Sequence, residues 1–124
     1  QLIKRVLEDS SRAVYQGKIF VNSKAQKTDG YQLSKAILLN KDSEFNAKPE
    51  LEIYADDVKC SHGSTVGEID ENQLYYLQTR GISKRDSKNI LINAFCADIV
   101  EKASDEDIKK HFKTLINNWL SNNE

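Results

Sequence analysis

The hydrophobic period of the sequence changes near residue 70, and this change constrains the fold more than any other feature. Before residue 70, apolar and polar side chains alternate in short runs, as in residues 17–21 and 51–55. A period of two is typical of β-strands with one buried face. After residue 70 the apolar residues recur with a helical period. The sequence therefore predicts a β region, residues 1–70, followed by a small helical region, residues 71–124.

The β region contains several runs of β type that are separated by polar turns. This spacing of strand, corner and strand fits either a sandwich or the coils of a β-helix, and the period alone does not separate the two. The expected runs are LIKRVL (2–7), RAVYQGKIFV (12–21), YQLSKAILL (31–39) and LEIYADDVKC (51–60). The expected turns lie at residues 22–23, 28–30, 40–43 and 48–49.

Three capped helices are expected in the second region. Each begins after a residue whose side chain can accept hydrogen bonds from the first turn, and three residues later a polar residue can complete a capping box. Gly81 is a suitable residue to end the first helix. The expected helices are 71–80 after Asp70, 84–102 after Ser83, and a third after Ser104 with the apolar residues Ile108, Phe112, Leu115, Ile116 and Trp119, followed by a frayed end at 121–124.

Composition limits the classes of function. The formal net charge is −1 and the sequence pI is near 6.2, so no overall basic field attracts nucleic acid or an anionic membrane. No apolar run approaches the roughly 20 residues that span a bilayer. The chain contains no methionine and begins with QLIKRVL, which indicates a piece of a longer protein.

The two cysteines, Cys60 and Cys96, are too few for a disulfide framework, and they indicate a reducing, cytoplasmic compartment. Cys96 stands among apolar neighbours, Ala94, Phe95, Ala97 and Ile99. We therefore expect it to be a buried, inert thiol.

The stretch Cys60-Ser61-His62 is the sharpest chemical signal in the sequence. On a strand, residues two apart share a face and lie about 6.6–7 Å apart. A thiolate and an imidazole both suit iron, zinc and copper. Two ligands do not complete a site, so a metal here needs further ligands from a partner chain or from a transient cargo. The competing interpretation is a structural strand end, and a Cys–His nucleophile is less favoured because no oxyanion hole is evident.

The two helices that flank residues 81–83 also resemble a helix-turn-helix DNA reader. Lys84, Arg85 and Lys88 lie at the start of the second helix, where base contacts would be made. Asp86 interrupts this basic face, and capped helical hairpins are common. A hairpin for packing or for docking a partner is therefore favoured over DNA binding.

A carbohydrate-active β-helix enzyme is a further alternative. Such an enzyme needs carboxylates that converge on one groove. Asp56 and Asp57 are adjacent, so they point to opposite faces of an extended segment. This argues against the enzyme, and the two acids are better explained as a corner before Val58.

Residues 25–83 resemble the C-terminal core of the SufB/SufD family of iron–sulfur cluster assembly proteins. The run ADDVKCSHG, residues 55–63, is the most specific piece, and its CxHG form is similar to SufD rather than to SufB. The other pieces that carry the resemblance are AQKTD (25–29), PELEI (49–53), YL (76–77) and RGI (80–82).

The resemblance implies a fold and a function. The fold would be the terminal coils of a right-handed parallel β-helix in residues 1–70, followed by a helical subdomain in 71–124. The function would be that of a non-enzymatic scaffold for iron–sulfur cluster assembly, which pairs with SufB and docks the ABC-type ATPase SufC. The residues expected to dock SufC are Leu74, Tyr75, Tyr76, Leu77 and Ile82.

The resemblance also implies a role for the Cys-x-His pair. His62, with Cys60 beside it, would be a ligand of a nascent iron–sulfur cluster at the interface with SufB, and the remaining ligands would come from that partner. No cluster is expected to stay bound to this fragment alone, and self-association as a homodimer is an expected substitute for the SufB pairing. No nucleic acid and no membrane are expected as partners.

Overall fold

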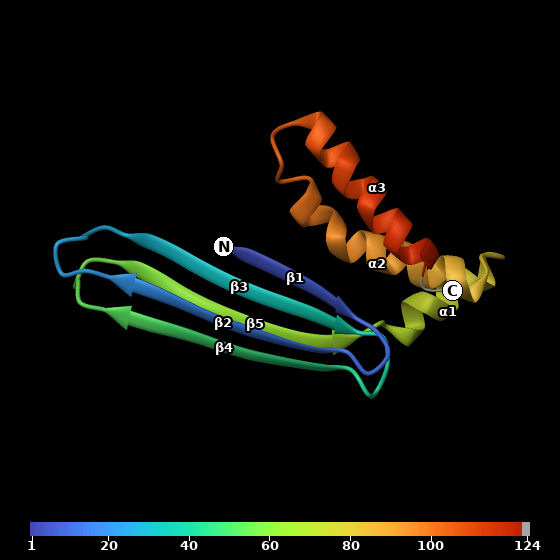
Figure 1. Cartoon of the computed structure of the whole chain (residues 1–124), viewed down its shortest axis with the longest axis horizontal. Coiled ribbons are helices and arrows are strands. Elements are labelled where there is room, and N and C mark those ends of the chain that lie inside the picture. The colour runs from blue at the N-terminus through green and yellow to red at the C-terminus, as the bar shows by residue number, and fades with distance from the viewer. Residues whose placement is uncertain (123–124) are drawn as a thin grey trace. The chain divides into compact units, whose positions relative to one another are not determined.

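The structure, a computed structural model, describes residues 1–122 and consists of five strands followed by three helices (Figure 1). The predicted order, β and then α, is confirmed. The chain divides into two compact units, Gln1–Glu68 and a helical unit that begins at Ile69. The strands are β1 (Leu2–Leu7), β2 (Arg12–Val21), β3 (Asp29–Leu38), β4 (Glu44–Ile53) and β5 (Lys59–Glu68), and the helices are α1 (Glu71–Thr79), α2 (Lys84–Val100) and α3 (Glu106–Asn122).

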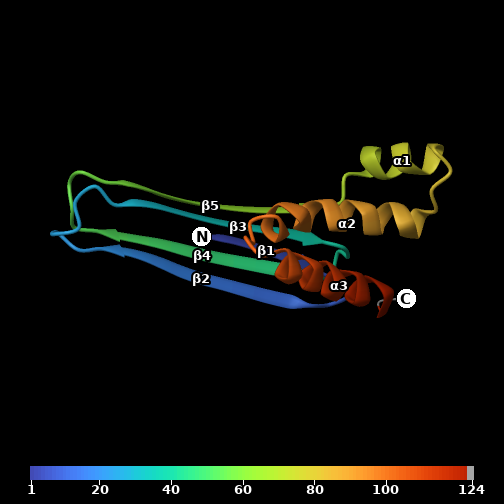
Figure 2. The ribbon, with the colours of Figure 1, turned by 90° about the horizontal axis from the view of Figure 1, so that it is seen from above.

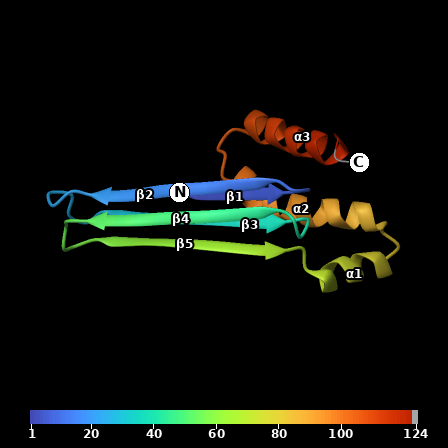
Figure 3. The same cartoon turned by 60° about the horizontal axis from the view of Figure 1, so that its bottom comes forward.

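Consecutive strands alternate between two parallel sheets. One sheet has the order β1-β3-β5 and the other has the order β2-β4. Each strand pairs in parallel with the strand two places earlier, as in Leu2 with Leu33 and Asp29 with Lys59. In Figure 3 the strands descend in chain order: β1 and β2 are at one level, β3 and β4 are at the next, and β5 is the lowest.

The fourth predicted run was wrong in position, and the fifth strand was missed. The pattern indicated a strand at residues 51–60 and a turn at 48–49, whereas β4 runs from Glu44 to Ile53 and contains Pro49. Proline lacks a ladder donor but is tolerated on an edge strand, and β4 is an edge of its two-stranded sheet. The residues of β5 are mostly polar and exposed, so they carry no alternation to detect. Asp56 and Asp57 form the bend between β4 and β5, as expected.

The first unit has an apolar core between its two sheets. Its buried members are Leu7, Tyr15, Ala36 and Phe45, and partly buried apolar residues pack against them. The guanidinium of Arg5 lies over two aromatic rings of this core, 5.3 Å from the centroid of Tyr15 and 5.4 Å from that of Phe45. These contacts show which face of each sheet points into the core between them.

Charged pairs join β2 and β4 on the opposite, exposed face. Arg12 Nε donates to Glu44 Oε2 over 2.7 Å, and Lys18 forms an ion pair with Glu52. Hydrogen bonds from Asn46 and Arg12 lower the pKa of Glu44, and the hydrogen bond from Lys18 lowers the pKa of Glu52. All these groups are solvated, so the pairs support the register of the strands more than the stability of the fold.

The first two helices begin at the predicted caps. Asp70 accepts from the backbone of Asn72 over 2.8 Å, and Ser83 accepts from the backbone of Asp86 over 3.0 Å. Gly81, with φ +85°, ends the first helix as expected, since this left-handed conformation favours glycine. Figure 2 shows α2 between α1 and α3. None of the helices in residues 1–122 has the length and apolarity needed to cross a membrane.

The third helix differs from its prediction in its cap and in its apolar face. Asp105, not Ser104, accepts from the backbone nitrogens of Asp107 (2.8 Å) and Ile108 (3.0 Å). The aspartate is better placed because α3 begins at Glu106. Leu120 is the buried residue of the helix, whereas four of the five predicted apolar residues are exposed: Ile108, Phe112, Leu115 and Trp119. The expected frayed end, 121–124, is helical to Asn122, and its last two positions lie outside the described residues.

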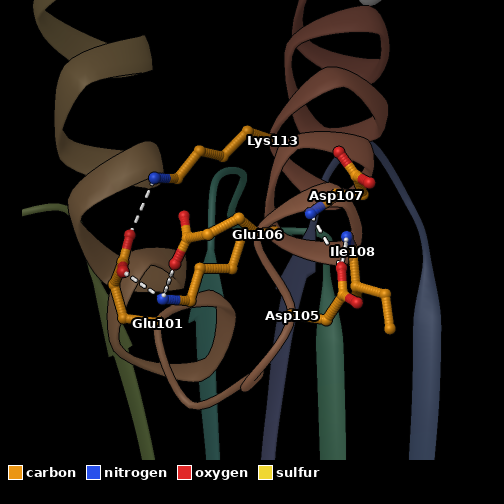
Figure 4. A network of polar contacts seen from close by, with 7 residues as sticks. Glu101, Asp105, Glu106, Asp107, Ile108 and Lys113 are labelled. Atoms are coloured by element: carbon orange, nitrogen blue, oxygen red, sulfur yellow. Dashed lines mark hydrogen bonds and ion pairs between the residues drawn. The ribbon is translucent and has the colours of Figure 1, made fainter.

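A network of ion pairs connects the end of α2 with the first turns of α3 (Figure 4). Glu101 lies 2.7 Å from Lys113 and 3.5 Å from Lys109, and Lys109 also contacts Glu106 over 2.7 Å. The hydrogen bond from Lys113, the larger cause, lowers the pKa of Glu101. The stabilisation from this carboxylate is therefore present at neutral pH and is lost as the pH falls through that lowered pKa.

Replacement of Gly17 tests the packing between the sheets. A Cβ at this position would overlap Tyr15 Oη and Gln32 Nε2. We expect Gly17→Ala to lower the free energy of unfolding in urea by about 1–3 kcal/mol, as overpacking does. Gly67→Ala is the matched control, since a Cβ there meets nothing within 4 Å, and it should change stability by less than about 0.5 kcal/mol. Equal effects of the two variants would contradict the inward placement of Gly17.

The cap of α3 gives a second test. Asp105→Ala removes the acceptor of two backbone hydrogen bonds and should cost about 0.5–2 kcal/mol of stability. Ser104→Ala lies one residue outside the cap and should cost no more than a few tenths, about 0.3 kcal/mol. Thermal unfolding followed by circular dichroism compares the two. A larger loss from Ser104→Ala would restore the cap that the sequence pattern predicted.

Candidate functional site

Cys60 and His62 lie on the same face of β5, the face that continues the inner side of β3. In the parallel register, Cys60 pairs with Gly30 and His62 pairs with Gln32. The Cys60 sulfur lies 3.4 Å from the position that a Cβ of Gly30 would take, and Ile19 of β2 lies 3.6 Å from that same position. The thiol therefore points between the sheets, over the space that the missing side chain of Gly30 leaves open.

The inner face of β5 is open to solvent although the inner face of β3 is covered. The second sheet contains only β2 and β4, so among the described residues no strand of that sheet stands at the level of β5 (Figure 3). Cys60 is half-buried and His62 is exposed. A thiol and an imidazole on one uncovered strand face are available to a ligand or a partner.

Behind this pair lies a polar stripe on β3 that the sequence pattern did not reveal. Gln32 is 2% exposed and Ser34 is 0% exposed, and both face the interior. Gln32 Nε2 donates to Gln1 Oε1 over 3.2 Å, and the Tyr15 hydroxyl lies 3.5 Å from the same oxygen. The run Gln32-Leu33-Ser34 would suggest the opposite orientation, with the leucine inside. The orientation of β3 follows from its pairing with β1 and β5. The residues of β3 alone do not reveal this pairing.

The helical unit carries an apolar groove between α1 and α2. Its volume is about 370 Å³. Tyr76 forms part of its wall, and the Arg80 guanidinium lies 5.2 Å from the Tyr76 ring centroid. The lining residues are Asn72, Gln73, Tyr76, Leu77, Ile90 and Leu91.

Comparison with known proteins identifies the relatives of this arrangement. A family model described as the SufBD core domain of the SUF system for FeS cluster assembly matches residues 1–95. The chain belongs to the SufBD family. The predicted resemblance is thereby confirmed, because this match covers more than half of the chain.

Individual SufBD relatives match most of this chain but only part of their own length. The iron–sulfur cluster assembly protein SufD of Escherichia coli is 48% identical over 120 residues, which cover 97% of this chain and 28% of that protein. A SufBD family protein of Synechocystis is 38% identical, over 82% of this chain and 22% of its own length. SufD of Bacillus subtilis is 33% identical, over 90% and 25%. The chain thus spans about a quarter of the length of these three relatives.

The five residues that were expected to dock a partner do not form one surface in this SufBD chain. Tyr76 and Leu77 line the groove, Tyr75 is 71% exposed but is not among the lining residues, and Ile82 is half-buried in the following turn. Leu74 is 6% exposed and belongs to the helical core, so its side chain offers little surface for docking. Helical spacing explains this correction, since adjacent residues on a helix point about 100° apart.

Two groove residues were missed, because α2 contributes them. Ile90 and Leu91 lie on the second helix and were not among the residues expected to dock a partner, but Ile90 is 44% exposed and both line the groove. The one sequence signal for them was that α2 has more apolar residues than a single buried stripe requires, which indicates a second apolar surface. Cys96 also differs from its prediction in this SufBD chain, since it is half-buried rather than buried.

Proposed function

We propose that this chain is part of a non-catalytic scaffold protein for iron–sulfur cluster assembly. Membership of the SufBD family and the likeness to proteins named SufD support this function. The observation that carries the proposal is the placement of Cys60 and His62 on one uncovered face of an edge strand. Both residue types bind iron, and both side chains are accessible in part.

The cluster is cargo in this proposal, and two donors hold it only in part. Iron–sulfur clusters are commonly held by about four protein ligands, so Cys60 and His62 would supply one side of the coordination. The other side would come from a partner, which we propose to be SufB. The chain contributes the strand face that presents thiol and imidazole together.

We propose that the partner pairs at β5. The alternation of strands between two parallel sheets supports a right-handed parallel β-helix, of which these would be the terminal coils. The outer edge of β5 has no partner strand among the described residues, and such edges are templates for strand addition. SufB would add there, and a second copy of this chain would do so when SufB is absent.

We further propose that SufC, the ATPase subunit, docks on the groove between α1 and α2. Exposed aromatic residues beside an apolar groove are typical of the centre of an interface. Tyr76, Leu77, Ile90 and Leu91 provide this combination. The proposal moves the docking surface away from Leu74 and toward α2.

Replacement of His62 tests the cluster role. In the full-length protein with SufB and SufC, His62→Ala should leave the complex assembled because the exposed ring contributes little to the core. Cluster content per complex after anaerobic purification should fall by about tenfold or more, since even groups that only support a metal ligand contribute about 10–100-fold in affinity. His111→Ala, on exposed α3, is the matched control and should leave the content unchanged. Normal content in a stable His62→Ala complex would remove His62 from the site.

Replacement of Tyr76 tests the docking groove. Tyr76→Glu places a charge in an apolar wall and should weaken SufC binding by about 2 kcal/mol, or about 30-fold, as loss of an interface anchor does. Tyr31→Glu is the control: Tyr31 is 54% exposed, close to the 57% of Tyr76, but it lies on β3. Titration calorimetry measures both. Equal binding by the two variants would move SufC to another surface.

A further inference from the structure

We propose that Gln32 is a positioning residue for His62. Its side-chain carbonyl oxygen would accept a hydrogen bond from one imidazole nitrogen, so that the other nitrogen presents its lone pair to the ligand. This inference deepens the proposed function and rests on it for its purpose, although the hydrogen bond itself lies within this chain. Neither the Cys-x-His motif nor the family match assigns a role to Gln32.

The register of β3 and β5 brings the two residues together. Gln32 is the direct partner of His62 in the parallel ladder. Partners in a parallel ladder project their side chains to the same side, and neighbouring strands lie about 4.8 Å apart. An extended glutamine and an imidazole can therefore meet across the two strands. No other side chain of β3 has this relation to His62.

The carbonyl oxygen of Gln32 is available for this contact. The residue is 2% exposed, and its amide nitrogen already donates to Gln1 Oε1 over 3.2 Å. Its Oε1 atom is buried and has no hydrogen-bond partner among the described residues. A buried acceptor without a donor is unfavourable, so the interior offers a place for one N–H group.

His62 needs an acceptor of this kind. A neutral imidazole has one N–H donor and one nitrogen with a free lone pair, and which nitrogen is which depends on the hydrogen bonds around the ring. Imidazoles that bind metals commonly donate their second nitrogen to a carbonyl or carboxylate oxygen. The His62 ring is exposed, so packing alone does not hold it. The Gln32 carbonyl can select its tautomer and its orientation.

The tautomer of His62 provides a test that requires no cluster. Long-range proton–nitrogen NMR of the full chain, labelled with ¹⁵N-histidine and kept at alkaline pH, reports which ring nitrogen carries the proton. The chain has only two histidines, so a His111→Gln variant assigns the signals. We expect one dominant tautomer for His62 in the unmodified chain. Gln32→Leu should convert it to a mixture like that of a solvated imidazole, while the signals of His111 stay unchanged.

Two further variants separate orientation from a general effect on the fold. Ser34→Ala is the matched control: Ser34 lies on the same strand and face, is fully buried and also has an oxygen without a partner, but its ladder partner is Ser64. It should leave the His62 tautomer unchanged. Gln32→Glu keeps an acceptor and should keep one dominant tautomer.

The outcomes decide the proposal in either direction. A tautomer mixture in the unmodified chain overturns it, even where Gln32→Leu does not fold. So does a dominant tautomer that persists in Gln32→Leu, or one that is lost equally in Ser34→Ala. These results are independent of cluster content. Normal cluster content in His62→Ala would refute the cluster role and leave the hydrogen bond standing, whereas a failed tautomer test would refute only the positioning role.

Discussion

The parallel pairing of each strand with the strand two places earlier is the constraint on which the β unit depends. A parallel register aligns like faces, so the inner positions of one strand stack on the inner positions of the next. This single ladder brings Gly30 to Cys60 and Gln32 to His62. A shift of one residue would send each of these side chains to the opposite face. The candidate site therefore depends first on the strand register and only then on the Cys-x-His motif.

The same ladder explains why the interior is partly polar. Tyr15, Gln32 and Ser34 enter it together with the apolar residues Leu7 and Phe45. Buried polar groups require partners, and here the side chain of Gln1 supplies one while some oxygens keep none among the described residues. Stability comes from the apolar part of this core. Two members of the polar part, Gln32 and Ser34, lie on β3, the strand that pairs with the open strand β5.

In the helical unit, by contrast, capping residues and a glycine close to the helix ends determine most of the structure. The caps at Asp70 and Ser83, together with Gly81, set where α1 and α2 begin and where α1 ends. The groove between α1 and α2 is the exception, since it requires two helices to meet. For this reason the helix bounds could be predicted closely, whereas the groove residues could be predicted only on α1.

The amino-acid sequence by itself determined the order of strands and helices, the first two helix caps, the corner at Asp56 and Asp57, and the family, because each depends on residues close together in the chain or on a specific run. The tertiary structure alone decided that 44–53 and 59–68 are strands, that Gln32 faces inward, and that Leu74 is buried. β5 and the inner face of β3 have no useful hydrophobic alternation, and their orientation follows from hydrogen bonds to strands far away in the sequence. Long-range pairing, rather than local propensity, makes that choice.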